Sequence, residues 1–310
     1  SSIKYDSIFE AMHYRKGDSL KTPDFVKRAD GIFECGTSDL EKRYVSDMAP
    51  DWISMNCINC NQCSFVCPHG VIRPFLLSEK EYQEAPTEIQ NRAVKAIGMD
   101  NYYYIISASV ADCTGCGLCV KTCPGKKGEK ALTMDKLDKK EQEIFDYLST
   151  HVEEKKEFNT YTVKGSQFKE PKFRFSGACA GCGETAYIKL LTQLFGNHLI
   201  ISNATGCSSI YGASAPSMPY TIPWASSLFE DNAEYGYGML IANTTLRHRI
   251  ASIMSKNMDN ENSELFKKWL ENSESYENTK EVYDHLTENL PSELKDLKQY
   301  IVARNIWCIG

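Results

Sequence analysis

Two short stretches of the chain carry four cysteines each at the same spacing. They read CINCNQCSFVCP and CTGCGLCVKTCP, and their cysteines are Cys57, Cys60, Cys63, Cys67, Cys113, Cys116, Cys119 and Cys123. Three thiolates at two-residue intervals can wrap a tight loop around one corner of an iron–sulfur cubane, while the fourth cysteine and the proline after it leave that loop. The spacing therefore predicts two 4Fe-4S clusters and transfer of single electrons.

The fourth cysteine of each motif decides how the ligands are shared. In bacterial two-cluster ferredoxins this cysteine binds the other cluster, and we expect the same crossed pairing here. The first cluster then takes Cys57, Cys60, Cys63 and Cys123, and the second takes Cys113, Cys116, Cys119 and Cys67. Structural zinc or a disulfide framework is the alternative, which the repeated spacing disfavours.

The residues around the motifs suggest local structure rather than further chemistry. Small and amide residues, such as Asn59, Asn61, Gly115 and Gly117, are expected to act sterically by letting the loops approach the sulfurs. Between the motifs, residues 76–98 predict a helix broken near Pro86, and residues 101–110 predict a strand. His69 is interpreted as a surface histidine, in preference to a hydrogen-bond partner of a cluster sulfur.

Composition limits the class of protein. A chain of 310 residues can form about two domains. The formal charge is −6 and no basic stretch interleaves with aromatics, so nucleic acid is not expected as the main partner. The sequence has no apolar run of about 20 residues and no signal peptide, which predicts a soluble intracellular protein. The N-terminal Ser1 and the apolar end at 305–310 suggest a piece of a longer protein.

The second half of the chain holds further candidate ligands. Cys179 and Cys182 form a C-x-x-C pair that is followed by Glu184. Residues 199–212 combine an apolar strand, Cys207 and a loop of small residues, a pattern typical of a cofactor or phosphate loop. Residues 256–300 predict acidic helices with turns at Asn-Ser and at Pro291, before a last strand.

Five blocks that span nearly all of the sequence resemble the C-terminal part of pyruvate:ferredoxin (2-oxoacid:acceptor) oxidoreductases. They are GTSDLEKRYVSDMAPDWI, CNQCSFVCPHGVIRPFLLSEKE, FSGACAGCGETAYIKLLTQLFG, NATGCSSIYG and PWASSLFEDNAEYGYGM. The resemblance implies oxidative decarboxylation of pyruvate to acetyl-CoA and CO2, with single electrons passing through 4Fe-4S clusters to ferredoxin or flavodoxin. An electron-transfer, polyferredoxin-like subunit of another reductase is the alternative, which leaves the last three blocks without a role.

The resemblance also implies cofactors and their ligands. Cys179, Cys182 and Cys207 become ligands of a third, proximal 4Fe-4S cluster whose fourth ligand lies outside this chain, and Cys308 is interpreted as a buried thiol. Thiamine diphosphate is expected near Glu184, Gly206, Ser208 and Ser209. The Mg²⁺ ligands are expected beyond Gly310. No catalytic residue is assigned, because the family's catalytic, substrate and coenzyme A residues lie in N-terminal domains.

The expected architecture is an α+β ferredoxin-like domain with a truncated α/β thiamine diphosphate-binding domain. Residues 1–34 end a preceding segment, extended through Lys21–Phe25. Residues 35–145 form the two-cluster domain, 146–164 a linker, and 165–310 the thiamine domain, incomplete at its C-terminus. The expected partners are the remaining domains of the same enzyme, in a homodimer. The expected location is the cytoplasm of an anaerobe or an organelle such as a hydrogenosome.

Overall fold

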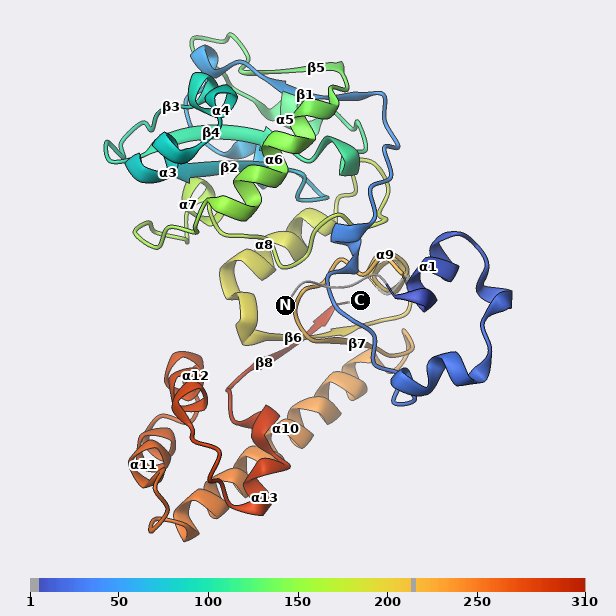
Figure 1. Ribbon diagram of the computed structural model, residues 1–310, viewed down its shortest axis with the longest axis vertical. Helices are drawn as coiled ribbons and strands as arrows, with labels where there is room; N and C mark the ends of the chain where they lie inside the picture. Colours follow the sequence, from blue (N-terminus) through green and yellow to red (C-terminus); the bar gives the residue numbers. More distant parts are fainter. Residues whose placement is uncertain (1–5, 213–215, 310) are drawn as a thin grey trace. The chain divides into compact units, whose positions relative to one another are not determined.

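The computed structural model describes residues 6–212 and 216–309 and divides them into two compact units (Figure 1). The first unit takes the described residues of 1–196 and 210–221, and the second takes those of 197–209 and 222–310. Each unit has its own cluster of buried apolar side chains. The chain as described is a mixed α/β structure with small sheets.

Two small antiparallel sheets form the first unit. β1 (Met48–Trp52) pairs with β5 (Leu132–Lys136), which follows the second cysteine motif. β4 (Tyr103–Ala108) lies between β2 (Ile72–Leu77) and β3 (Val94–Lys95). Since β4 is the central strand of its sheet, its residues from Tyr104 to Ala108 are buried. The strand predicted over 101–110 is thus confirmed.

Short helices connect these strands. The α-helices are α1 (Ser7–His13), α2 (Gln62–Phe65), α3 (Glu79–Glu84), α4 (Thr87–Arg92), α5 (Leu118–Thr122), α6 (Lys139–His151), α7 (Val163–Ser166) and α8 (Thr185–Phe195). The 3-10 helices are η1 (Gly17–Ser19), η2 (Thr22–Arg28), η3 (Thr37–Leu40), η4 (Ser54–Asn56) and η5 (Val110–Asp112). The break predicted near Pro86 is confirmed, because α3 begins at a Ser78–Glu81 capping box and α4 begins after Pro86. The helix predicted over 76–98 is too long, since its first two residues belong to β2 and Val94–Lys95 form β3.

The second unit is built on a parallel three-stranded sheet. Its strand order is β7 (Trp224–Ser226), β6 (Leu199–Asn203) and β8 (Asn305–Ile309). The helical elements are η6 (Gly196–His198), α9 (Cys207–Gly212), α10 (Asn232–Lys256), α11 (Ser263–Glu271), α12 (Tyr276–His285), α13 (Ser292–Lys295) and η7 (Lys298–Tyr300), of which η6 and α9 begin or end in the first unit. The acidic helices are confirmed, and so are the strand predicted at the start of 199–212 and the last strand predicted at 305–310, which the structure places at Leu199–Asn203 and Asn305–Ile309.

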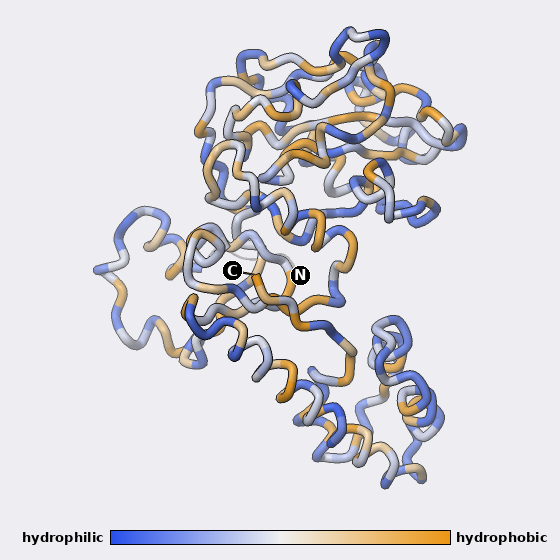
Figure 2. The backbone as a smooth tube through the Cα atoms, turned by 180° about the vertical axis from the view of Figure 1, so that it is seen from behind, coloured by the Kyte–Doolittle hydropathy of each residue, from blue (hydrophilic) through white to orange (hydrophobic). Residues whose placement is uncertain are grey.

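Hydrophobic and hydrophilic stretches are interspersed along the chain (Figure 2). In the first unit the rings of Phe75 and Phe145 meet edge to face with centroids 5.9 Å apart. In the second unit Trp269 is buried among α10, α11 and α13, and its indole nitrogen donates to the Ile301 carbonyl at 2.9 Å. Within the described residues, we find no helix with the length and apolarity that a membrane crossing needs.

Three local expectations are wrong. Residues 22–28 form the 3-10 helix η2 rather than an extended segment, since the fixed φ of Pro23 suits the first turn of a helix. Residues from Cys207 to Gly212 form the helix α9 rather than a loop. Cys308 is exposed rather than buried, because β8 is an edge strand of its sheet.

The predicted segments do not coincide with the compact units. The first unit extends from the predicted N-terminal segment through the predicted linker to residue 196, and the second begins inside the predicted thiamine domain. The assignment of residues 35–145 and 165–310 to two functional domains therefore stays a prediction. The role expected of Gly310 lies outside the described residues.

Candidate metal centres

Four cysteines from both motifs line one cavity of the first unit. These are Cys57, Cys60, Cys63 and Cys123. The cavity has about 330 Å³ of space that no atom fills, part of it open to solvent. Its other walls are mostly apolar and include Trp52, Ile106 and Leu132. We call it the first cavity.

The other four cysteines line a second cavity of similar size. These are Cys67, Cys113, Cys116 and Cys119, around about 350 Å³ of space that again includes some open solvent. Val71, Ile72 and Met134 are among its apolar walls. In each cavity three cysteines come from one motif and the fourth comes from the other. The structure thus brings together the two sets that the crossed pairing predicts.

The two motifs use the same backbone turn to present their first three cysteines. The third residue of each motif, Asn59 or Gly115, and the fifth, Asn61 or Gly117, all have left-handed φ values between 55° and 70°. Asparagine is one of the few residues other than glycine that accepts this conformation. The fifth residue is followed directly by α2 in one motif and by α5 in the other.

Asn59 and Asn61 also hydrogen-bond, which the steric interpretation missed. Asn61 donates to the Lys164 carbonyl at 2.7 Å and accepts from the Tyr104 hydroxyl at 2.8 Å. Asn59 accepts from the Ile97 amide at 2.8 Å. Both asparagines are buried, so they tie the first motif to β4 and α7. The repeated asparagine at two-residue spacing was the sequence signal for this role.

Burial makes the cysteines reluctant to ionise on their own. Burial, together with neighbouring cysteines, raises the pKa of Cys113 to about 11 and that of Cys119 to about 12. The pKa of Cys63 is also raised, by burial first and then by Cys119 of the second cavity. Such thiols become thiolates when a metal replaces the proton. These buried cysteines therefore fit a metal site in which the bound metal, rather than the protein alone, keeps the thiols ionised.

Neither alternative to clusters gains support from the described residues. All thirteen cysteines are among them, and none forms a disulfide. No three His, Cys, Asp or Glu side chains in this part of the chain are close enough to hold one metal ion. A cubane is bound differently, because each thiolate binds a separate iron atom.

His69 is buried, and its interpretation as a surface histidine is wrong. Only 2% of it is exposed, and it lies in the wall of the second cavity. Its Nε2 is 2.9 Å from the Ala178 carbonyl oxygen, and its own carbonyl accepts from the Phe175 amide at 2.8 Å. Burial lowers its pKa. The segment 175–178, more than 100 residues away in sequence, covers this histidine.

Lys189 is a fully buried lysine that the sequence did not single out. It lies on α8, and its ammonium donates to the Ser64 carbonyl, to the Phe65 carbonyl at 3.3 Å and to Gln167 at 3.3 Å. In the sequence, Ser64 and Phe65 lie between Cys63 of the first cavity and Cys67 of the second. Burial lowers the pKa of Lys189 to about 8.

The predicted proximal pair lies against the second cavity. Cys179 and Cys182 form a tight turn in which the Cys182 amide donates to the Cys179 carbonyl at 3.0 Å. A Cβ on Gly181 would lie 3.7 Å from the Cys116 Cβ and 3.8 Å from a Leu118 methyl. This turn thus packs on the loop that carries two ligand candidates.

The predicted thiamine-side residues belong to both units. Glu184, at the N-terminus of α8 in the first unit, helps burial to raise the pKa of the Tyr211 hydroxyl. Cys207, Gly206, Ser208 and Ser209 belong to the second unit. There Ser208 donates to the Ala204 carbonyl at 3.0 Å, and Ser209 both accepts from the Gly206 amide and donates to the Gly206 carbonyl.

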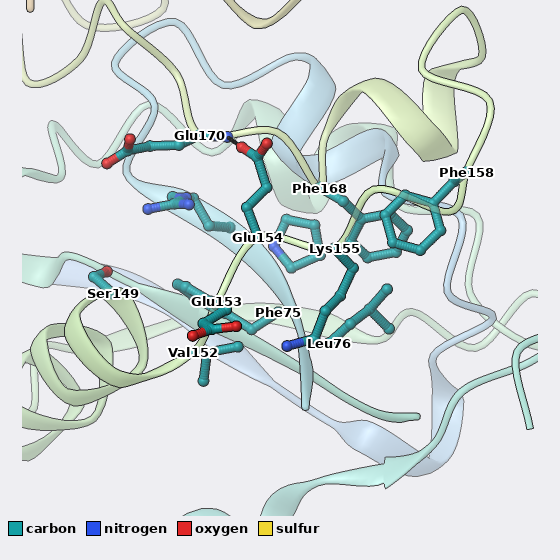
Figure 3. Close-up of a pocket in the computed structure, with 12 residues that line it drawn as sticks. Phe75, Leu76, Ser149, Val152, Glu153, Glu154, Lys155, Phe158, Phe168 and Glu170 are labelled. Carbon is teal, nitrogen blue, oxygen red and sulfur yellow. Dashed lines mark hydrogen bonds between the residues drawn. The ribbon is translucent and has the colours of Figure 1, made fainter. Parts of the chain in front are cut away.

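Another open pocket of the first unit contains no cysteine. Its walls combine charged and aromatic side chains, among them Glu153, Lys155, Phe158, Phe168 and Glu170 (Figure 3). Lys155 pairs with Glu81 at 2.6 Å, and Glu170 pairs with Arg174 at 2.7 Å. Because its charged groups are used in this way, we assign it no cofactor.

Comparison with known protein families matches one part of the chain to a class of domain. Residues 56–127, which contain both cysteine motifs, match the family described as 4Fe-4S dicluster domain. This part of the chain is thus similar to domains of that class.

Comparison over the whole chain identifies its relatives. The chain is 42% identical to the pyruvate-flavodoxin oxidoreductase of Klebsiella pneumoniae, over 98% of this chain and 27% of that protein. It is 43% identical to the pyruvate:ferredoxin oxidoreductase of Moorella thermoacetica, over 98% of this chain and 28% of that protein. The pyruvate dehydrogenase [NADP(+)] of Cryptosporidium parvum is 42% identical, over 91% of this chain and 15% of that protein.

These similarities confirm the resemblance drawn from the five sequence blocks. The chain is similar over nearly its whole length to pyruvate:ferredoxin and pyruvate-flavodoxin oxidoreductases, and it spans about a quarter of the length of these two relatives.

Proposed function

We propose that the chain is the electron-transfer part of a pyruvate:acceptor oxidoreductase, an enzyme that converts pyruvate and coenzyme A to acetyl-CoA and CO2. The observation that carries the proposal is the gathering of all eight motif cysteines into two cavities of four. Similarity over 98% of the chain to two such oxidoreductases supports the reaction. It argues against an electron-transfer subunit of an unrelated reductase, which would account for residues 56–127 alone.

The two cavities would each hold one 4Fe-4S cluster. Cys57, Cys60, Cys63 and Cys123 would be the ligands in the first cavity, and Cys113, Cys116, Cys119 and Cys67 in the second. A bound 4Fe-4S cluster can gain and lose single electrons. The chain supplies mostly apolar walls, and amides such as that of Ala131, whose nitrogen lies 3.3 Å from the Cys123 sulfur.

The segment after residue 175 would serve the thiamine diphosphate side of the enzyme. Cys179 and Cys182, with Cys207, would be three ligands of a proximal cluster, and the remaining ligand would come from elsewhere. Glu184, with Gly206, Ser208 and Ser209, would lie near thiamine diphosphate and its Mg²⁺. The proposal for the cysteine pair is supported by the packing of Gly181 against Cys116, which puts the pair next to the second cavity.

The remaining partners follow from the same proposal. Ferredoxin or flavodoxin would accept the electrons, as the names of the relatives indicate for those proteins. The other domains of the enzyme would supply the binding of pyruvate and coenzyme A, in a homodimer located in the cytoplasm of an anaerobe. The chain by itself would lack a complete active site.

The test of the electron-transfer function is anaerobic reconstitution followed by reduction with dithionite. We expect iron and acid-labile sulfide in equal amounts, and an electron paramagnetic resonance signal of two interacting reduced clusters. Rapid mixing with methyl viologen should then reoxidise the protein by about two electrons per chain. Recovery of bound zinc in place of iron, or a reduced protein without this signal, would contradict the proposal.

A further inference from the structure

The second cavity is the one that adjoins the thiamine-side cysteine pair. Gly181 packs on Cys116, and His69 in the cavity wall contacts Ala178. No residue of 178–182 lines the first cavity. Under the proposed function, on which this inference rests, electrons enter at the second cavity and leave from the first.

Exposed apolar side chains stand around the first cavity. Ile58 lines the cavity and is 39% exposed. Met55, two residues before Cys57, is 82% exposed, and Ile97, whose amide is held by Asn59, is 54% exposed. Exposed apolar groups that gather at one place mark an interaction site.

A rigid basic turn completes the edge of the same cavity. Pro124 and Gly125 line the cavity, and the chain then turns back through a mutual backbone pair between Lys126 and Glu129 at 3.0 and 3.1 Å. A Cβ on Gly125 would lie 1.8 Å from the Glu129 carbonyl oxygen, so the turn is closely packed. Lys130 is anchored by the Val120 and Lys121 carbonyls.

Three lysines of this segment are exposed to solvent and take part in no ion pair among the described residues. They are Lys121, Lys126 and Lys127. Glu129 is the only acidic residue between 121 and 130. The local balance is positive in a chain whose formal charge is −6.

We propose that this surface docks a small acidic protein that carries single electrons. We call it the rim surface and define it by Met55, Ile58, Ile97, Lys121, Lys126 and Lys127. It combines an apolar centre with a charged edge, as protein interfaces do. The basic edge attracts an acidic carrier, while the net negative charge of the chain disfavours approach elsewhere.

The step at this surface is a transfer of one electron. The group held in the first cavity is oxidised by one electron and the carrier is reduced by one, and no group is transferred between the two proteins; a flavin carrier takes any proton that it needs from solvent. The contribution of the rim surface is to the rate of encounter and to the orientation of the carrier. Loss of its positive charge should therefore slow an acidic protein acceptor and should not slow a small cationic acceptor.

The experiment compares two acceptors on two charge-matched variants of the reconstituted chain. Lys126→Glu/Lys127→Glu reverses the charge of the turn. Lys139→Glu/Lys140→Glu makes the same charge change at the exposed start of α6, which lines neither cavity. The dithionite-reduced protein is mixed with a flavodoxin of net negative charge or with methyl viologen, over a range of salt concentrations.

The second-order rate with flavodoxin should fall about 10- to 100-fold at low salt in the turn variant, with the difference shrinking as salt increases. The α6 variant carries the same net charge but leaves the rim surface and both cavities unchanged, so its rate should fall much less than that of the turn variant. Methyl viologen is a small dication, so neither variant should reduce it more slowly than the unmodified chain does. Equal flavodoxin rates in the two variants would overturn the docking proposal, whereas failure of the unmodified chain to reduce viologen would overturn the electron-transfer function itself.

A variant at the apolar centre of the rim surface separates docking from simple charge attraction. Met55→Asp changes a side chain that is 82% exposed and outside the cavity wall. If the carrier docks here, the flavodoxin rate should fall even at a salt concentration that screens the lysines, and the viologen rate should not. An unchanged flavodoxin rate at high salt would overturn the assignment of the apolar centre.

Discussion

At the scale of single residues, two cysteines of the same motif can line different cavities, and two cysteines of different motifs can line the same one. Cys67 and Cys113 share the second cavity, whereas Cys113 and Cys123 share a motif but line different cavities. We predict that Cys67→Ser/Cys113→Ser removes ligands from one cluster and leaves about four irons per chain. Cys113→Ser/Cys123→Ser should damage both clusters and leave fewer. Iron and sulfide analysis after identical reconstitution measures both.

The two double variants control for each other, because each removes two thiols. Clusters that were each bound by one whole motif would give the reverse order of iron content. That order would contradict the crossed ligand sets, while leaving the presence of clusters intact.

Lys189 is predicted to influence both clusters. Its ammonium, held at Ser64 and Phe65, is a buried positive charge between the ligand candidates Cys63 and Cys67. Positive charge favours the more negative, reduced state of a cluster. Lys189→Met should shift the midpoint potentials to more negative values and, by leaving buried carbonyls without a donor, cost about 1–3 kcal/mol of stability.

Redox titration followed by electron paramagnetic resonance, with urea unfolding beside it, tests the Lys189 variant. Lys140→Met, at an exposed position, is the control and should change neither quantity. A loss of stability with unchanged potentials would show that Lys189 only supports the packing of α8.

The sequence predicted the residues whose role is local and missed those whose role depends on distant segments. The cysteine sets follow from a repeated spacing within two short loops. The burial of His69 depends on Ala178, and the hydrogen bonds of Lys189 depend on Gln167 and on the first motif. No pattern within one window of the chain reports such contacts.

At the scale of elements, α10 packs closely on β8 because a glycine of α10, Gly236, has no side chain at the contact. A Cβ on Gly236 would lie 2.2 Å from the sulfur of Cys308, whereas a Cβ on Gly238 would have nothing within 4 Å. Gly236→Ala should therefore destabilise the chain by about 1 kcal/mol through overpacking, because the Cys308 side chain has to turn away. Gly238→Ala, in the same helix, should stabilise it by up to about 1 kcal/mol.

Urea unfolding followed by circular dichroism measures the two glycine variants. Adding Cys308→Ala to Gly236→Ala should restore most of the lost stability, because the sulfur is the atom in the way. If Gly236→Ala were as stable as Gly238→Ala, the close packing of β8 on α10 would be refuted.

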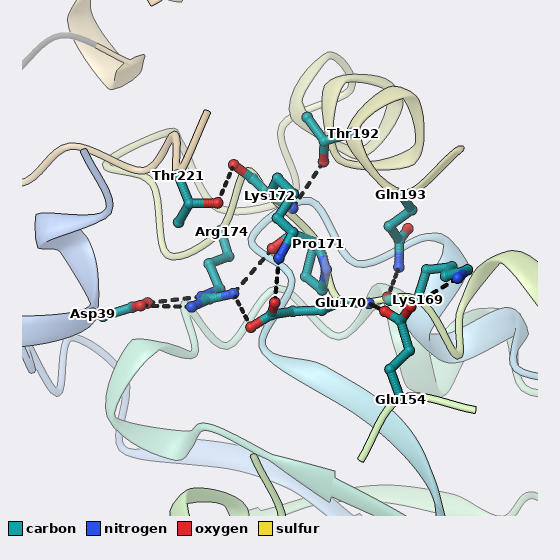
Figure 4. A network of polar contacts seen from close by, with 10 residues as sticks. All are labelled: Asp39, Glu154, Lys169, Glu170, Pro171, Lys172, Arg174, Thr192, Gln193 and Thr221. Atoms are coloured by element: carbon teal, nitrogen blue, oxygen red, sulfur yellow. Dashed lines mark hydrogen bonds and ion pairs between the residues drawn. The ribbon is translucent and has the colours of Figure 1, made fainter. Parts of the chain in front are cut away.

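A polar network joins η3 to the segment before α8 and predicts a pH dependence. Arg174 pairs with Asp39 at 2.6 Å and with Glu170 at 2.7 Å, and Lys172 also contacts Glu170 (Figure 4). Burial alone would raise the pKa of Glu170, but the cations outweigh it and hold the pKa at about 2. Glu170 therefore stabilises the fold above about pH 4.5, its unfolded pKa, and the contribution is lost as the pH falls towards 2.

Glu170→Gln should make the free energy of unfolding fall less steeply between about pH 5 and pH 3 than in the unmodified chain. Anaerobic urea titrations followed by tryptophan fluorescence measure the two slopes. Both proteins carry the same cysteine sets, so acid loss of the clusters affects them alike. Parallel pH profiles would be incompatible with the ion pairs of Glu170.

Most elements with a local signal were predicted, and those without one were not. Pro86 and the Ser78–Glu81 box mark their own helix boundaries, and the apolar runs at 199–203 and 305–309 became strands. The exposure of Cys308 depends on β8 being an edge strand, which is a property of the sheet order. Apolar character alone does not distinguish an edge strand from a central one.

At the scale of the whole chain, the thirteen cysteines fall into three groups. Eight line the two cavities, three are the proposed proximal ligands Cys179, Cys182 and Cys207, and the other two are Cys35 and Cys308. A 4Fe-4S cluster needs four ligands, so the group of three is one short. The iron content of the intact chain therefore tests this assignment of the thirteen cysteines to three groups.

We predict about eight irons and eight sulfides per chain, unchanged in Cys179→Ser and in Cys308→Ser, because three thiolates alone should not retain a cubane through purification. Cys57→Ser is the positive control and should lower the content to about four. About twelve irons in the unmodified chain, falling to eight in Cys179→Ser, would mean that a third cluster is complete. If Cys308→Ser caused the same fall, Cys308 would be its fourth ligand; if it did not, the ligand would come from outside the cysteines of this chain.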